Sequence, residues 1–217
     1  MLKVWFIRHG QSQANAGEKT SDSSGIELTE LGRKQADYIG NYFERDPDLI
    51  VSSPYLRALQ TAQFLTSRVP NAPFEIWPVQ EFTYLSQERC RDTTVTERGP
   101  MAGEYWDRYD PHYVDGDLAE SFASLMTRVD SMWNILLEMR GDKWVVLFSH
   151  AMFIKAALWR WLHPDNRVTP KGMRHYRNFL YSFPIPNGAI LEADFDRNLS
   201  FGPPWTEHFP DDLRGAR

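Results

Sequence analysis

The first residues able to do chemistry follow directly on an apolar run at the start of the chain. Leu2 to Ile7 has the continuous apolar character of a buried strand, and Arg8, His9 and Gly10 come immediately after it. Imidazole is a potential nucleophile, guanidinium is a fixed positive charge, and glycine lets the backbone come close to an anion. At the carboxyl end of a strand, where open parallel sheets bind ligands, the triplet predicts a phosphate site. Taken alone, it is more typical of a solvated strand end.

Two later strands lead to residues of the same kinds. Residues 48–52 form a predicted strand that leads to Arg57 in the first turn of the next helix, and residues 143–149 form another that leads to His150. By themselves, Arg57 also fits a surface arginine and His150 a histidine packed in the core. Because the carboxyl ends of parallel strands share one edge of a sheet, we expect both side chains to lie beside the N-terminal triplet.

The alternation of strands and helices predicts an α/β fold, a three-layer α/β/α sandwich with a mostly parallel central sheet. Thr29 and Ser53 are predicted helix caps, and Pro54 suits the first helical position after Ser53. The predicted strands span residues 2–7, 48–52, 74–77, 143–149 and 188–196, and the predicted helices span 28–45, 54–69, 120–140 and 151–162.

Two segments lack the regular spacing of apolar residues that is typical of helices and strands. The chain of 217 residues contains no repeat and predicts one domain over 1–217, with an insertion at about 82–118 that is long enough to be functional. We expect this insertion to cover the pocket, although its side chains fit local packing equally well: Tyr84, Arg89, Arg91, Arg98, Tyr105, Trp106 and Arg108. Residues 163–186 are predicted to be irregular and basic, with Arg167, Lys171, Arg174 and Arg177.

Composition excludes several classes of partner. A net charge of −5 argues against general nucleic-acid binding, and no apolar run is long enough for a membrane span or a signal peptide. Cys90 is the only cysteine, so no internal disulfide forms, and the other histidines (His112, His163, His175 and His208) lack metal-site spacing. We therefore expect a cytoplasmic protein without metal or cofactor; the sequence leaves the oligomeric state open.

The order and spacing of these motifs resemble those of the histidine phosphatase superfamily, the phosphoglycerate mutase-like proteins. The resemblance extends through most of the chain, over residues 8–15, 28–36, 52–62, Glu81, 120–122 and 149–151. It implies that His9 is the nucleophile and forms a phosphohistidine, with Arg8, Arg57 and His150 around the transferred phosphoryl group. The fixed positive charges then stabilise the negative charge on the equatorial oxygens of the phosphoryl group, so that no magnesium ion is needed.

Glu81 follows the predicted third strand, where similar enzymes carry the acid that protonates the leaving oxygen and then activates water. A solvated glutamate is the plainer interpretation of this position. After Glu81 the chain departs from the family pattern, because residues 82–85 (Phe-Thr-Tyr-Leu) replace a stretch that commonly contains glycine and tryptophan. This departure leaves the substrate in doubt more than the mechanism.

Four further residues are expected to contact the substrate phosphate. Gln11 and Asn15 are candidate hydrogen-bond donors, with capping of their own loop as the alternative, and Ala151 offers a backbone N–H at the start of a helix. Gly10 allows close approach, and its carbonyl is a candidate acceptor for the second ring nitrogen of His9.

Three functions fit these residues. The preferred one is hydrolysis of a small phosphorylated molecule through a phosphohistidine. The alternative is a phosphoglycerate-type mutase, whose second anionic group would bind Arg89, Arg91 or Arg98. A non-catalytic binder of phosphorylated ligands is the third and is disfavoured by the intact set of reactive side chains.

Overall fold

The computed structural model describes residues 1–139, 141–164, 168–195 and 199–214. Arg167, the last residue of the predicted helix 120–140 and the last residue of the predicted strand 188–196 lie outside the described residues. In chain order the elements are β1 (Leu2–Arg8), α1 (Glu30–Tyr42), β2 (Leu49–Ser52), α2 (Leu56–Arg68), β3 (Phe74–Ile76), α3 (Gly99–Arg108), α4 (Phe122–Glu138), β4 (Lys143–Ser149), α5 (Ala151–Leu162), α6 (Pro170–Leu180), β5 (Ile190–Phe195), β6 (Leu199–Phe201) and the short 3-10 helix η1 (Asp211–Leu213).

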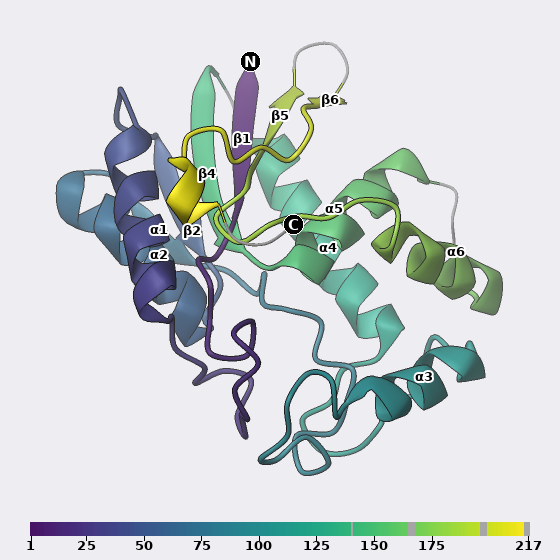
Figure 1. Ribbon diagram of the computed structural model, residues 1–217. Coiled ribbons are helices and arrows are strands. Elements are labelled where there is room, and N and C mark those ends of the chain that lie inside the picture. Colours follow the sequence, from purple (N-terminus) through teal and green to yellow (C-terminus); the bar gives the residue numbers. More distant parts are fainter. Residues whose placement is uncertain (140, 165–167, 196–198, 215–217) are drawn as a thin grey trace.

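The strands form one mixed sheet in the order β3-β2-β4-β1-β5-β6. β1 to β4 run parallel to one another, whereas β5 and β6 pair antiparallel at one edge. Helices α1 and α2 cover one face, and α4 and α5 cover the other, with α6 beside α5 (Figure 1). The predicted α/β sandwich with a mostly parallel sheet is confirmed.

Each face of the sheet has its own hydrophobic core. Val4 and Phe6 of β1 pack in the core that α4 and α5 cover, whereas Trp5 and Ile7 pack in the core beneath α1 and α2. Both faces of this central strand are therefore buried, which explains why its sequence is continuously apolar rather than alternating.

The register of the central strands brings the reactive segments together. β1 and β4 pair so that Arg8 lies opposite Ser149, and the His9 N–H donates to the Ser149 carbonyl at 3.0 Å. On the other side of β4, the Ser53 N–H donates to the Phe148 carbonyl at 2.9 Å. The ends of β1, β4 and β2 are thus held side by side by backbone hydrogen bonds.

Helix boundaries differ from the prediction at three places. Helix α2 begins at Leu56, so Ser53 does not cap it and Pro54 lies before its first turn. Gly99 and Pro100, in the insertion for which no helix was predicted, begin α3, because proline suits the first turn of a helix. The segment 163–186, expected to be irregular, contains α6, whose cap Thr169 accepts a hydrogen bond from the Gly172 N–H.

None of the helices in the described ranges combines the length and the apolar character needed to cross a lipid bilayer.

Two glycines let the loop after β1 pack directly on helix α1. A Cβ on Gly32 would overlap the carbonyl oxygen of Gln11, and a Cβ on Gly10 would overlap the carbonyl oxygen of Gly32. The backbone of the reactive loop therefore rests on the first turn of α1, which leaves this loop little freedom to move.

We expect Gly32→Ala to lower the free energy of unfolding by about 1–3 kcal/mol, because a methyl group must be forced between two packed backbones. Gly103→Ala is the matched control: Gly103 lies in α3 with open space around it, and alanine there should raise stability by about 0.5–1 kcal/mol. Urea denaturation midpoints measure both effects. Equal midpoints for the two variants would contradict this packing.

Candidate active site

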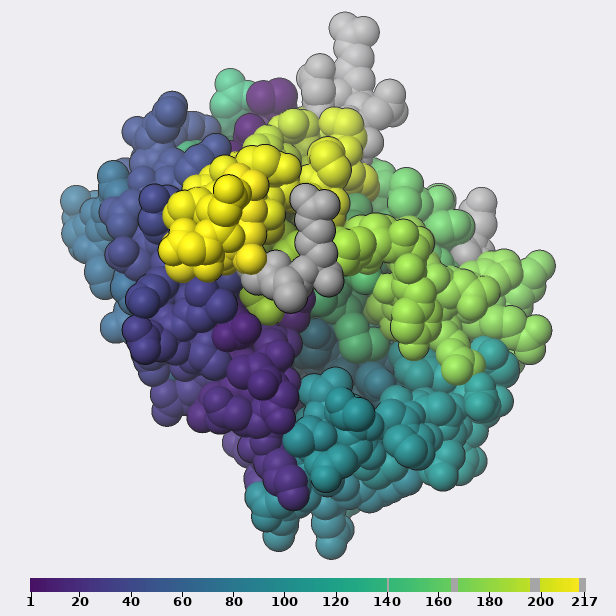
Figure 2. All heavy atoms as spheres, in the orientation of Figure 1, coloured from purple at the N-terminus to yellow at the C-terminus, as the bar shows by residue number. Residues whose placement is uncertain are grey.

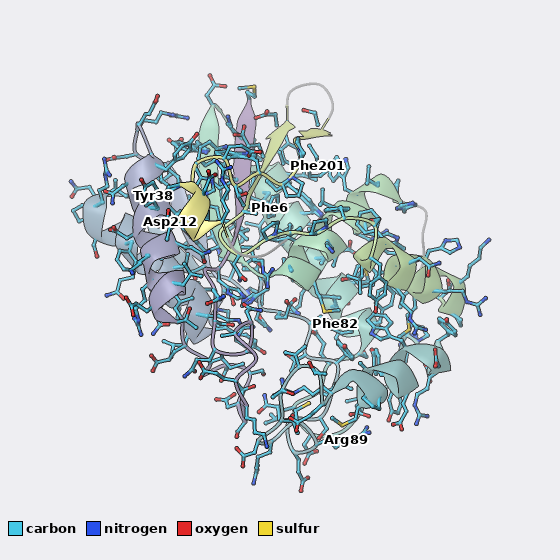
Figure 3. The ribbon with its side chains drawn as sticks, in the orientation of Figure 1. Phe6, Tyr38, Phe82, Arg89, Phe201 and Asp212 are labelled. Carbon is cyan, nitrogen blue, oxygen red and sulfur yellow. The ribbon has the colours of Figure 1, made fainter. Side chains whose placement is uncertain are left out.

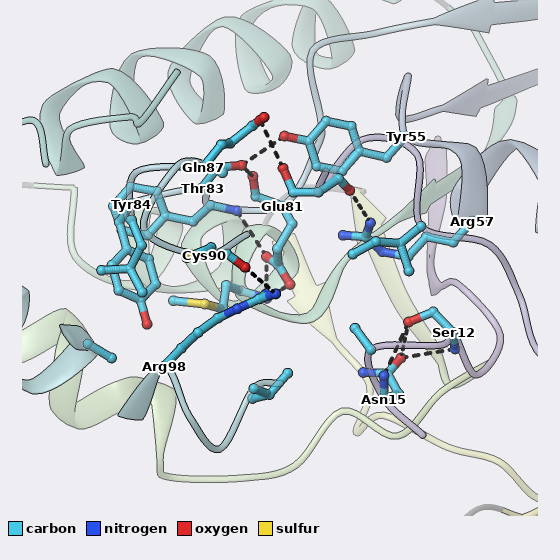
Figure 4. A pocket seen from close by; sticks show the side chains of 18 of the residues that line it. Ser12, Asn15, Tyr55, Arg57, Glu81, Thr83, Tyr84, Gln87, Cys90 and Arg98 are labelled. Atoms are coloured by element: carbon cyan, nitrogen blue, oxygen red, sulfur yellow. Dashed lines mark hydrogen bonds between the residues drawn. The ribbon is translucent and has the colours of Figure 1, made fainter. Parts of the chain in front are cut away.

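A cavity of about 440 Å³ lies at the carboxyl end of β1 and is lined by five of the residues predicted from the sequence (Figure 4): Arg8, His9, Asn15, Arg57 and Glu81. The loop after β1, the start of α2 and the inserted segment supply its walls. Gly10, Gln11, His150 and Ala151 lie outside its lining. The cavity is in the volume range of small-molecule sites, about 300–1,000 Å³.

The hydrogen bonds of His9 define one tautomer. Its Nδ1 lies 2.7 Å from the carbonyl oxygen of Gly10, which can only accept, so Nδ1 carries the proton. Its Nε2 accepts from Nε of Arg57 at 3.1 Å. Burial, followed by the charges of Arg57 and Arg8, holds the pKa of His9 well below its ordinary value. The ring is therefore neutral, with its lone pair on Nε2.

Two arginines supply the positive charge. Nη1 of Arg57 donates to the Ser23 carbonyl at 2.7 Å, and the guanidinium lies 5.1 Å from the centre of the Tyr55 ring. Burial lowers the pKa of Arg57 to about 10, so it remains charged at neutral pH. Nη1 of Arg8 donates to the Ile185 carbonyl at 2.7 Å, while its buried Nε has no partner among the described residues. An anion in the cavity would meet both charges.

Glu81 lies in the cavity wall with one carboxylate oxygen fully engaged. Its Oε1 accepts from the backbone N–H groups of Phe82, Met152 and Phe153 at 3.1, 3.0 and 3.2 Å. The last two belong to the first turn of α5 and follow directly on Ala151, the residue whose N–H was expected to bind phosphate. Burial raises the pKa of Glu81 despite the opposing effects of Arg57 and the N–H donors. The carboxyl group can hold a proton on Oε2, which has a single long contact of 3.4 Å, with the Met152 N–H, among the described residues.

His150 lies behind His9 rather than in the cavity wall. It is 0 % exposed, and the centres of the two imidazole rings are 5.0 Å apart. Burial and the charge of Arg57 hold the pKa of His150 well below its ordinary value, so this ring is neutral too.

A serine sets the proton of this second ring. Oγ of Ser53 lies 2.8 Å from Nε2 of His150 and accepts from the Tyr55 N–H at 3.2 Å. Its own proton then goes to Nε2. The alternative leaves two buried groups without a partner, the hydroxyl proton and the lone pair of Nδ1, whereas this arrangement leaves only one, the proton on Nδ1, and each such group costs about 1–3 kcal/mol. The proton of His150 therefore lies on Nδ1, which is buried and has no protein partner in the described ranges.

The remaining predicted residues have structural contacts. The Gly10 N–H donates to Oγ1 of Thr61 at 3.1 Å, and Oε1 of Gln11 accepts from Oγ1 of Thr29 at 2.8 Å, away from the cavity. Asn15 does line the cavity, and its Oδ1 accepts from Oγ of Ser12 at 2.9 Å. Capping of its own loop, the alternative considered for both side chains, thus describes Asn15, which also accepts from the Ser12 N–H at 3.2 Å, whereas the side chain of Gln11 contacts the cap of α1.

The inserted segment fits both of its predicted descriptions. Phe82, Tyr84 and Leu85 line the cavity, whereas Tyr105 and Trp106 are buried in the core that α4 and α5 cover. The segment thus covers the pocket with one set of side chains and packs locally with another.

Two of the arginines predicted to bind a second anionic group, Arg89 and Arg98, are engaged by protein groups, and the third, Arg91, is exposed and outside the cavity lining. Arg89 pairs with Asp115 and with Glu104, at 2.6 and 3.1 Å, and does not line the cavity. Arg98 does line it, but its Nε and Nη2 donate to oxygens of Thr20, Cys90 and Thr93.

Sequence reasoning missed the functional contact of Ser53, because a serine before proline is a common helix cap and its partner lies 97 residues away. In the part of the chain that the structure describes, no three or more His, Cys, Asp or Glu side chains gather as a metal site would require.

Comparisons with known proteins agree with this geometry. A family model described as "Histidine phosphatase superfamily (branch 1)" matches residues 4–195. A glucosyl-3-phosphoglycerate phosphatase of Mycolicibacterium vanbaalenii is 43 % identical over 161 residues, 71 % of each chain. An acid phosphatase of Mycobacterium tuberculosis is 26 % identical over 169 residues, 74 % of this chain and 75 % of that one. A phosphoserine phosphatase structure from Entamoeba histolytica has a TM-score of 0.73 at 23 % identity and covers 97 % of this chain and 100 % of that one.

The two ring assignments predict a distinctive nitrogen spectrum. At pH 6.5, where an ordinary imidazole is half protonated, both His9 and His150 should be neutral with the proton on Nδ1. Two-dimensional NMR of ¹⁵N-histidine protein reports this directly, because protonated and unprotonated ring nitrogens resonate far apart. In Ser53→Ala, His150 alone should lose its single tautomer, whereas Ser52→Ala removes an adjacent buried hydroxyl and should change neither ring. A charged His150, or a proton on its Nε2, would contradict the assignment.

Proposed function

Because the chain belongs to branch 1 of the histidine phosphatase superfamily and is a phosphatase, we propose that it hydrolyses phosphate monoesters without a metal ion, through a phosphohistidine on His9. The observation that carries this proposal is the state of His9: a buried, neutral ring whose lone pair faces a cationic cavity. A charged imidazole has no lone pair with which to attack phosphorus, so the lowered pKa is a requirement of the chemistry.

In the first step, Nε2 of His9 forms a bond to phosphorus while the bond from phosphorus to the alcohol oxygen breaks. The departing oxygen takes the proton from Glu81, which becomes a carboxylate. The Nε–H of Arg57 keeps its proton but changes its hydrogen-bond acceptor, from Nε2 of His9 to a phosphoryl oxygen. Arg8 and the Nδ1–H of His150 stabilise the negative charge on the other phosphoryl oxygens. The ring of His9 gains a positive charge, which the Gly10 carbonyl stabilises through Nδ1.

In the second step, the Glu81 carboxylate takes a proton from a water molecule as the water oxygen attacks phosphorus. The bond from Nε2 to phosphorus breaks, inorganic phosphate leaves, and His9 returns to its neutral form. Glu81 is protonated again at the end, so the cycle closes without another reactant.

The mutase remains the second candidate, since a 2,3-bisphosphoglycerate-dependent phosphoglycerate mutase of Pelagibacter ubique is 23 % identical over 231 residues. Hydrolysis is favoured because Arg89 is paired with two carboxylates outside the cavity.

The substrate is proposed to be a small phosphorylated molecule, as the names of the related phosphoserine and glucosyl-3-phosphoglycerate phosphatases suggest. We further propose one domain over 1–217 with an insertion at 82–118, and, from the single cysteine, a cytoplasmic location.

The proposal predicts release of phosphate from para-nitrophenyl phosphate in the presence of a metal chelator. His9→Ala should abolish turnover, because it removes the ring nitrogen that lies beside Arg57 in the cavity wall with its lone pair available. His175→Ala, which changes an exposed histidine of α6, is the control and should retain full activity. Turnover that the chelator removes, or that survives in His9→Ala, would refute the proposed reaction. Phosphate exchange between bisphosphoglycerate and monophosphoglycerate without net release would select the mutase.

The pKa shifts, which belong to the protein without substrate, predict a bell-shaped dependence of kcat/KM on pH. Activity should rise as His9 loses its proton, at acidic pH because its pKa is lowered, and fall as Glu81 loses its proton, above the ordinary range of a carboxyl group because its pKa is raised. Glu81→Gln should remove the alkaline limb and lower kcat on glycerol phosphate by about 10²- to 10⁴-fold. Glu27→Gln, on an exposed glutamate, should leave the profile unchanged. An unaltered alkaline limb in Glu81→Gln would remove Glu81 from the mechanism.

A further inference from the structure

One arginine joins two walls of the cavity that are distant in sequence. The Nη2 of Arg98 donates to the carbonyl and the hydroxyl oxygen of Thr20 at 2.9 and 2.7 Å. The same side chain donates to Oγ1 of Thr93 through Nε at 2.8 Å, and to the carbonyls of Thr93 and Cys90 through Nη2 at 2.8 and 3.2 Å. A planar guanidinium with several fixed donors can hold such a set of oxygens, whereas an ammonium on a flexible stem cannot hold them all.

The contact continues on both sides of this arginine. The Thr20 N–H donates to the Thr93 carbonyl at 3.0 Å in an antiparallel bridge, and Oγ of Ser21 donates to Oδ1 of Asp92 at 2.7 Å. We call the five residues Thr20, Ser21, Asp92, Thr93 and Arg98 the latch. Figure 2 shows the N-terminal residues (purple) and the inserted segment (teal) meeting at the surface, where the latch joins them.

The latch is connected to the reacting groups through a short stretch of chain. Two residues beyond Ser21, the carbonyl of Ser23 accepts from Nη1 of Arg57 at 2.7 Å, and the hydroxyl of Ser23 accepts from Nε2 of Gln87 at 3.3 Å. The loop that the latch ties to the inserted segment is therefore the loop that holds Arg57. Ser21, Ser23, Gln87 and Arg98 all line the cavity (Figure 4).

The latch thus closes one side of the cavity. A phosphate placed between His9 and Arg57 has its alcohol portion between the loop before α1 and the inserted segment, in a total volume of about 440 Å³. A polypeptide that carried the phosphate would have to continue on both sides of its phosphorylated residue, through a wall that the latch holds together.

We propose that the latch restricts this enzyme to compact phosphate monoesters whose whole alcohol portion fits inside the cavity, and that it excludes phosphorylated side chains of polypeptides. The inference rests on the proposed function for its reaction and adds the substrate class. It assigns Arg98 a structural part in selectivity, in place of the binding of a second anionic group of the substrate.

The test compares two substrates with the same leaving group: N-acetyl-phosphotyrosine amide and a seven-residue peptide with phosphotyrosine at its centre. In the unmodified protein, kcat/KM for the peptide should be at least about 100-fold lower. Arg98→Lys and Arg98→Met should both narrow this ratio by at least about tenfold, since each loses the fork of donors. If Arg98 instead bound a second anionic group of the substrate, Arg98→Lys would keep the ratio of kcat/KM between the amide and the peptide. Only Arg98→Met would then lose activity on 3-phosphoglycerate relative to glycerol 3-phosphate. That result would overturn the proposal.

Arg89→Met is the matched control. Arg89 belongs to the same segment but lies at its outer edge, away from Phe82 in the cavity wall (Figure 3). Its pair with Glu104 is exposed; its other partner, Asp115, is buried and keeps hydrogen bonds from the Ser86 N–H and the Tyr113 hydroxyl when Arg89 is replaced. Its removal should leave the substrate ratio unchanged. A ratio that narrowed equally in Arg89→Met would show that general loosening of the segment, and not the latch, sets selectivity.

Calorimetric binding of both compounds to His9→Ala separates selectivity from catalysis. His9→Ala should bind the amide but not the peptide, and the double variant with Arg98→Lys should bind both. If the protein bound the amide but not the peptide and showed no turnover that depends on His9, the role of the latch in selectivity would stand and the proposed function would be refuted. If turnover depended on His9 but kcat/KM in the unmodified protein were equal for the amide and the peptide, the proposed function would stand and the role of the latch in selectivity would be refuted.

Discussion

The arrangement of the site depends on keeping a nucleophilic imidazole neutral and in one tautomer among buried cations. The Gly10 carbonyl holds the proton of His9 on Nδ1, and burial together with Arg57 and Arg8 disfavours a second proton. The arginines that disfavour protonation of His9 are also the positive charges that the proposed reaction requires for the substrate phosphate, so one set of charges meets both requirements. The rigid loop after β1, packed backbone to backbone on α1, is what makes this geometry stable before substrate arrives.

The polar groups that surround His9 are divided between structure and chemistry. The first turn of α5 donates to Oε1 of Glu81, which fixes that carboxyl group in the cavity wall and leaves Oε2 for the proposed proton transfer. Ser53 occupies Nε2 of His150 and thereby leaves Nδ1–H as the donor of that ring. The buried Nε of Arg8 and Nδ1 of His150 have no acceptor among the described residues, and such donors are costly unless a ligand supplies one. Both fit a site completed by a phosphoryl group.

Much of this site follows from local sequence patterns, and the rest does not. The ends of β1, β2 and β4 were predictable because a buried parallel strand is a continuous apolar run, and their shared edge brings Arg8, His9 and Arg57 into one cavity. Two helices were missed, α3 and α6, because their amphipathic patterns are short and each has a proline in its first turn, Pro100 and Pro170, where proline also marks turns. The pairing of Ser53 with His150 and the latch around Arg98 join residues 97 and 78 positions apart. No local period encodes such contacts; only the folded topology brings the partners together.

The most direct test of the account is to trap the covalent intermediate. Protein mixed rapidly with a phosphate monoester, quenched in alkali and digested should yield a phosphorylated peptide, because phosphohistidine survives base and is lost in acid. The account predicts that fragmentation by mass spectrometry places the phosphate on His9. With para-nitrophenyl phosphate, whose leaving group departs without a proton, the modification should accumulate in Glu81→Gln, where water is not activated. Phosphate on any other residue, or turnover without a phosphorylated peptide in either protein, would contradict it.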